Sequence, residues 1–143
     1  MVEAAKDGYM TGKFLCAAGF VVAMAGSAAA LAPLEDNARV QREFLAAAVG
    51  DEIRKNCDDI SARLWRVLSK ARESEKYALG LGYSKADIKA LREDKAAKAR
   101  LKGLRDAYLA KHGVSKGDEE SYCRLGREEI KKKSLTGWLL RAN

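Results

Sequence analysis

The sequence has little proline and few aromatic side chains. Pro33 is the only proline, and Phe, Trp and Tyr together make up 7% of the 143 residues. Alanine, leucine, lysine, arginine and glutamate are abundant instead, and their side chains lose little rotamer freedom in a helix. With 48% hydrophobic and 33% charged residues, the composition is that of one globular domain. No strand-like alternation competes with the helical patterns, so the sequence predicts an all-α fold.

Recognisable catalytic motifs are also missing. The glycines of "GLGY", residues 80–83, and of "CRLG", residues 123–126, lack the strand-to-helix context of a phosphate-binding loop. Acidic pairs such as Glu128-Glu129 consist of neighbours that point in different directions on a helix, so they do not form a two-carboxylate site. We therefore predict no catalytic residues and no cofactor.

An uncharged apolar segment occurs near the start of the chain. Residues 14–25, "FLCAAGFVVAMA", follow Lys13 and precede "GSAAALA". A positive start, an apolar middle and small residues at the cleavage point are the layout of a secretory signal. The sequence predicts a signal peptide over residues 1–30 and a single helical domain over residues 31–143, which places the mature protein in the periplasm.

Two features of this leader leave alternatives open. Glu3 and Asp7 fit a positively charged leader poorly, and Met10 would be a better start. Residues 14–32 carry no charge and approach the ~20 residues that a membrane helix needs, so an uncleaved inner-membrane anchor is the second interpretation.

The remaining residues predict a compact bundle of four to five helices. Asn37 can cap a helix over about 38–56, and Asp58 or Asp59 can cap the next one. Further starts are expected at Ser84, which is followed by Asp87, near Glu119, and after Ser134. Gly113 is placed to end the third helical segment. The apolar spacing of the second helix predicts that the following side chains point inward: Ile60, Leu64, Val67, Leu68 and Ala71.

Two cysteines remain once Cys16 leaves with the leader. In an oxidising compartment the even count predicts a disulfide between Cys57 and Cys123, which are 66 positions apart. With His112 they provide only three potential zinc ligands, so no metal site is expected. The alternative is a thiol–histidine pair of Cys123 and His112, which lacks a third group to orient the base. Gly126 indicates close packing, against the helix that carries Cys57.

The charge balance is strongly basic. The net charge is +7, and the leader contains equal numbers of acidic and basic residues. Such an excess attracts anionic partners, and export makes nucleic acid the least suitable of these. Trp65 and Trp138, with two tyrosines, Tyr83 and Tyr122, fit the edge of the core better than a binding patch. The possible binding surface consists of Arg54, Arg124, Arg127, Lys131, Lys132, Lys133 and Trp138.

Three segments together resemble a known family. They are "AAAVGDEIRKNCDDISARLWRVLSKA", "LRDAYLAKHGV" and "GDEESYCRLGREEIKKKSLTGWLLR". Over about residues 33–141 the chain resembles an uncharacterised family of small exported proteins from alphaproteobacteria, a domain of unknown function. The resemblance implies periplasmic residence and the Cys57–Cys123 pair, and it implies no activity.

These observations favour a small, non-enzymatic periplasmic interaction or envelope-associated module. Its partner would be an unknown protein or an anionic envelope component. The alternative is a small envelope enzyme or enzyme inhibitor, whose polar site near the disulfide would use Glu52, Arg54, Arg124 and Arg127. An enzyme should show a pocket with converging polar groups, whereas a binding module should show an exposed apolar or basic patch.

Overall fold

The computed structural model describes residues 31–143, so the predicted signal peptide lies outside the described residues. This part of the chain confirms the all-α fold, with six α-helices and one small sheet that the sequence did not predict. The elements are a short 3-10 helix, Leu34–Asp36, then α1, Ala38–Asn56; β1, Ile60–Ala62; α2, Leu64–Gly80; α3, Lys85–Glu93; α4, Lys95–Lys111; α5, Glu119–Lys132; α6, Leu135–Leu139; and β2, Leu140–Ala142.

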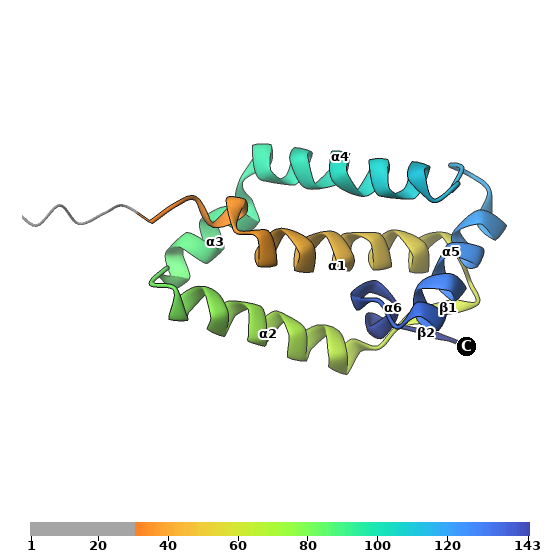
Figure 1. Ribbon diagram of the computed structural model, residues 1–143, viewed down its shortest axis with the longest axis horizontal. Helices are drawn as coiled ribbons and strands as arrows, with labels where there is room; N and C mark the ends of the chain where they lie inside the picture. The colour runs from red at the N-terminus through yellow and green to blue at the C-terminus, as the bar shows by residue number, and fades with distance from the viewer. Residues whose placement is uncertain (1–30) are drawn as a thin grey trace, which may run out of the picture.

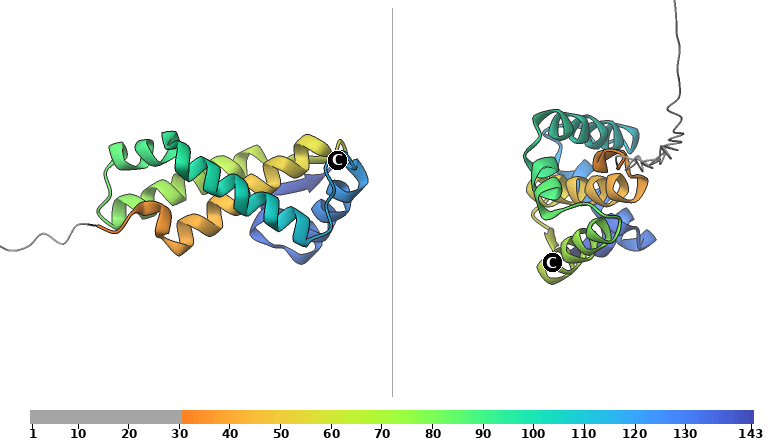
Figure 2. Two further views of the ribbon diagram at one scale, coloured as in Figure 1. Left: turned by 90° about the horizontal axis from the view of Figure 1, so that it is seen from above. Right: turned by 90° about the vertical axis from the view of Figure 1, so that its left-hand side faces the viewer.

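Helix α1 is the centre of the molecule. It lies between α4 on one side and α2 on the other, and α5, α6 and the sheet gather near its C-terminal end (Figures 1 and 2). Asn37 caps α1 as predicted, because its side chain accepts hydrogen bonds from the backbone N–H groups of Arg39 and Val40. Asn37 therefore fixes the residue at which α1 begins, and the C-terminal elements pack near the other end of the same helix.

Two apolar clusters lie at opposite ends of α1. The larger one surrounds the cysteines and contains Val49, Ile53, Cys57, Ile60, Leu109, Tyr122, Cys123, Leu125 and Leu140. The smaller one contains Leu34, Val40, Ala78 and Ile88. The elements near the C-terminal end of α1 therefore share the larger buried core, while α2 and α3 are held mainly by the smaller cluster.

The small sheet replaces a helix start that the sequence predicted. Asp58 and Asp59 do not cap α2, so this prediction is wrong; α2 begins at Leu64 without a side-chain cap. Instead β1 pairs antiparallel with β2, with Ile60 opposite Ala142. Ile60 and Leu140 are both buried in the larger cluster, and this burial outweighs the local preference for a helix.

The third predicted helix is two helices, divided at Asp94. The Asp94 backbone is extended, and its side chain accepts a hydrogen bond from the N–H of Ala97, which starts α4. The start of α3 follows the prediction: Ser84 and Asp87 form a reciprocal capping box. Gly113, with φ of 68°, follows the end of α4 in the left-handed conformation expected for it.

Candidate functional site

The predicted disulfide is present. Cys57 follows the last residue of α1, Cys123 lies in α5, and their Cα atoms are 5.2 Å apart. Both residues are buried in the larger cluster. The thiol–histidine interpretation is wrong, because Cys123 is bonded to Cys57 and has no free thiol to ionise.

Gly126 allows α5 to approach its neighbours closely, as the sequence predicted. A Cβ atom at this position would lie 2.2 Å from Cδ1 of Ile60 and 2.8 Å from Cγ2 of Ile53, which belongs to α1. Both isoleucine side chains are buried. The absence of a side chain therefore lets α5 cross the end of α1 beside the disulfide.

The arginines of the predicted binding surface have intramolecular partners. Arg124 donates to the backbone carbonyls of His112 and Gly113, at 3.0 and 3.1 Å, and so binds the C-terminal end of α4. It also pairs with Glu128 at 3.2 Å. Arg124 thus supports the fold as well as lying at its surface.

Several other residues of the predicted surface also have acidic partners within the chain. Arg54 pairs with Asp51, Arg127 with Glu120, and Lys132 with Glu128. Among residues 31–143, Lys131 and Lys133 have no carboxylate within ion-pair distance. Arg54 lines a hollow of about 210 Å³ between α1 and α2, together with Leu64 and Leu139.

A buried carboxylate joins three helices at the centre of the C-terminal half. Glu129 of α5 is 2% exposed. It accepts hydrogen bonds from the hydroxyl of Tyr108 in α4, at 2.8 Å, and from the hydroxyl of Ser134, which also caps α6. Burial, followed by the hydrogen bond to Glu129, raises the pKa of Tyr108 to about 12. Sequence patterns gave no indication of this cluster, because Tyr108 is 21 positions from Glu129 and belongs to a different helix.

We expect Tyr108→Phe to lower the free energy of unfolding by ~1.5–3 kcal/mol at pH 7, because a buried carboxylate loses a donor. The pKa of Tyr108 is raised in the folded state, so its contribution is complete below the unfolded pKa of ~10 and is lost as the pH rises toward 12. The deficit of the variant should therefore shrink between pH 10 and 12. Urea unfolding at pH 7 and pH 11 measures it, with Tyr83→Phe as the control. An equal deficit at both pH values would refute the proposed linkage.

Four exposed large apolar side chains lie where α2 begins and where α6 ends. Leu64 is 71% exposed, Trp65 74%, Leu68 52% and Trp138 38%. The inward orientation predicted for Leu64, Leu68 and Ala71 is wrong, and so is the core-edge interpretation of Trp65. We call Leu64, Trp65, Leu68, Trp138 and Arg66 the tryptophan corner.

Hydrogen bonds to α6 and β2 explain why these side chains face outward. The backbone N–H of Arg63 donates to the carbonyl of Leu139 at 2.8 Å, and its Nε donates to the carbonyl of Leu140 at 2.9 Å. These contacts fix the rotation of α2 at its first residue. Val67 then lies on the half-buried side and borders the hollow toward α1, while Leu64 and Leu68 are left exposed.

Arginine side chains complete the tryptophan corner. The guanidinium of Arg66 lies over the ring of Trp138, 5.0 Å from its centroid, and donates to the Trp138 carbonyl at 3.0 Å. Arg63 and Arg72 flank the apolar residues on α2 and are exposed. Among residues 31–143, these three arginines have no carboxylate within ion-pair distance. Trp65, Leu68 and Arg72 follow one another at intervals of three and four positions. This spacing is the only feature of the sequence that indicates that these three side chains share one face of a helix.

Among residues 31–143, no three Asp, Glu, His or Cys side chains are placed to bind a metal ion together. Within the same range, every helix is too short or too polar to cross a membrane.

Comparison with known proteins identifies a family but no activity. A model of the family of unknown function DUF5333 matches residues 32–141. Neither the curated proteins nor the solved structures compared with the chain include a match to it. Since the match covers more than half of the sequence, the chain belongs to the family of unknown function DUF5333.

Proposed function

We propose that this protein is a non-enzymatic, exported module that binds the anionic lipid surface of the cell envelope through the tryptophan corner. The observation that carries the proposal is the exposure of two tryptophans and two leucines beside unpaired arginines. Trp and Arg side chains have apolar bodies and polar tips, and both suit the boundary between lipid and water. Anionic head groups would attract the arginines, while the rings and leucines enter the acyl boundary.

The disulfide supports export. A bond between two buried cysteines forms and persists in oxidising compartments and is rare in the cytosol. We therefore place the mature protein in the periplasm, where its net charge of +7 favours binding to anionic lipid.

The residues named for an enzyme or inhibitor site do not favour that alternative. Glu52 pairs with Arg105 at 3.0 Å, and Arg54, Arg124 and Arg127 each pair with a different acid. These partners belong to surface ion pairs and to the end of α4. The four side chains therefore bind separate groups rather than one shared ligand.

We expect the full chain to bind vesicles that contain phosphatidylglycerol more tightly than vesicles of pure phosphatidylcholine. Trp65→Ala should weaken this binding ~10-fold or more, because the free energy of burying a large apolar side chain is lost. High salt should weaken binding of the wild type as well, by screening the arginines. Co-sedimentation with vesicles measures these differences.

The control is Leu81→Ala, which removes another exposed apolar side chain, 39% against 74% for Trp65, just beyond the other end of α2. Each variant retains residues 1–30, so a difference between variants reports the tryptophan corner alone. If Trp65→Ala and Leu81→Ala bind anionic vesicles as well as the wild type does, the lipid proposal is wrong. A protein partner would then be the better candidate for this surface.

A further inference from the structure

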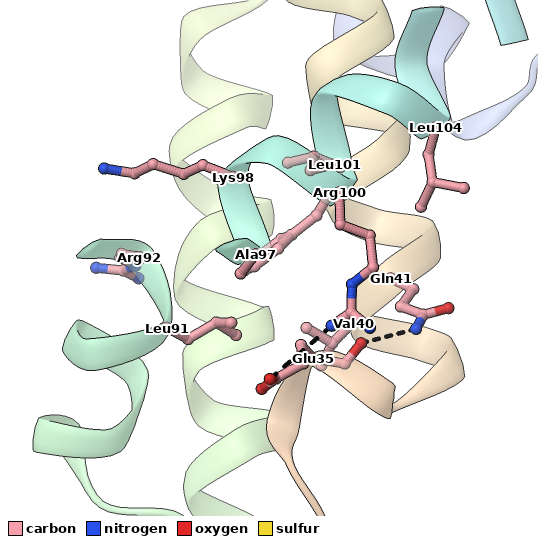
Figure 3. A pocket seen from close by; sticks show the side chains of 11 residues that line it. Glu35, Val40, Gln41, Leu91, Arg92, Ala97, Lys98, Arg100, Leu101 and Leu104 are labelled. Carbon is pink, nitrogen blue, oxygen red and sulfur yellow. Dashed lines mark hydrogen bonds and ion pairs between the residues drawn. The ribbon is translucent and has the colours of Figure 1, made fainter. Parts of the chain in front are cut away.

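A second apolar hollow lies between α1, α3 and α4, away from every residue of the tryptophan corner (Figure 3). Its volume is about 270 Å³, just below the ~300–1,000 Å³ typical of small-molecule sites. The apolar part of its lining consists of Val40, Phe44, Leu91, Ala97, Leu101 and Leu104. Leu104 is 44% exposed, so the hollow opens to solvent beside it.

The sequence of α4 explains why this space is not filled. The break at Asp94 turns the chain away from α3, and the first turn of α4 then presents the small side chain of Ala97 to the hollow. Leu91 from α3 and Leu101 from α4 reach the hollow from either side of this residue (Figure 3). Three helices therefore surround a space that their own side chains leave open.

The polar part of the lining is mainly cationic. Arg92, Lys98 and Arg100 line the hollow together with one carboxylate, Glu35. Arg100 pairs with Glu35 at 3.9 Å and with Asp36 at 3.4 Å.

The other two cations, Arg92 and Lys98, have weaker or no ion pairs within the described residues. Arg92 pairs with Glu75, but only at 3.9 Å. Within residues 31–143, Lys98 has no carboxylate at ion-pair distance. Figure 3 shows Lys98 running outward from α4 and Arg92 lying at the end of α3, so that both cations are at the same outer edge of the lining. A carboxylate at that side would meet one unpaired and one weakly paired cation.

We propose that this hollow binds a medium-chain fatty-acid anion. The alkyl chain lies against Val40, Phe44 and Leu101, and the carboxylate is held by Lys98 and Arg92. The size of the hollow suits one chain rather than the two chains of a phospholipid. The positive side chains at its edge select a carboxylate over a neutral or cationic head group. This site shares no residue with the tryptophan corner and does not depend on its function.

Isothermal titration of the full chain with decanoate, below its micelle-forming concentration, tests the proposal. We expect saturable binding that is at least ~10-fold tighter than for decanol, while decyltrimethylammonium, with the same chain length and the opposite charge, does not bind. Absence of saturable decanoate binding, or equal binding of the three compounds, would overturn the proposal.

Two pairs of variants locate the ligand. Ala97→Phe should fill the hollow and abolish decanoate binding, whereas Ala99→Phe, on the exposed side of the same helix, should not. Lys98→Glu should weaken decanoate at least ~10-fold and leave decanol unchanged, whereas Lys95→Glu, which lies outside the lining, should change neither. Thermal unfolding establishes that each variant folds. If Ala97→Phe folds poorly, the Lys98→Glu comparison alone decides, and an unchanged affinity for decanoate in that variant would overturn the assignment.

Discussion

We expect the double variant Cys57→Ala, Cys123→Ala to unfold with a free energy ~4 kcal/mol lower than that of the oxidised wild type. The disulfide joins residues 66 positions apart, and closing a loop of that length removes much of the freedom of the unfolded chain. Domains of this size are usually stable by only ~5–15 kcal/mol, so the loss is a large share. Urea unfolding followed by circular dichroism measures it.

Reduced wild type is the matched control for this variant. It keeps both sulfur atoms in the core and lacks only the covalent bond, so it separates the cross-link from the packing of two buried side chains. We expect the reductant to account for most of the loss and to leave the double variant unchanged. If reduced and oxidised wild type agree within ~1 kcal/mol, the cross-link does not stabilise this fold as proposed.

The disulfide also bears on the tryptophan corner. Cys57 directly follows the last residue of α1. The segment that joins it to α2 is short and contains only Asp58, Asp59, β1 and Arg63. The same short segment pairs with β2 and hydrogen-bonds to the end of α6. Holding Cys57 against α5 therefore helps to fix the direction in which α2 leaves the core.

Local signals in the sequence predicted those features that depend on a few neighbouring residues. Asn37, Ser84 with Asp87, and Ser134 cap helices through side chains that bind backbone N–H groups within three residues. Gly113 adopts the left-handed conformation that ends α4. The disulfide followed from the number of cysteines and the expected compartment, without knowledge of the fold.

Features that depend on distant contacts could not be predicted in this way. Leu64 and Leu68 have the spacing of a buried stripe, yet the hydrogen bonds of Arg63 to α6 and β2 rotate them outward. The apolar spacing predicts which side chains share one face of a helix, but it does not indicate which face a neighbouring element covers. Glu129 is buried because a tyrosine and a serine from other segments reach it, and spacing alone does not indicate such a cluster.

The second large effect is expected at Gly137, in the middle of α6. A Cβ atom there would lie 2.0 Å from the carbonyl oxygen of Glu129 and 2.5 Å from the backbone nitrogen of Ile130. Both atoms belong to the backbone of α5, so no side-chain rotation can relieve the clash. Gly137→Ala should therefore push α6 away from α5 and lower the free energy of unfolding by ~3 kcal/mol or more.

Gly103→Ala is the matched control, because it adds the same methyl group to a helix interior where a Cβ atom would meet nothing within 4 Å. That change should stabilise the protein by ~0.5–1 kcal/mol, since alanine loses less backbone freedom in a helix than glycine does. Urea unfolding of both variants should thus give shifts of opposite sign. A loss below ~1 kcal/mol for Gly137→Ala would mean that α6 can move without weakening the core.

Because α6 carries Trp138 and ends at the carbonyls that hold Arg63, the clash should also change the near-ultraviolet circular dichroism of the tryptophans. Stability and the geometry of the tryptophan corner are therefore expected to change together in this variant, whereas the control should leave the tryptophan signal as it is.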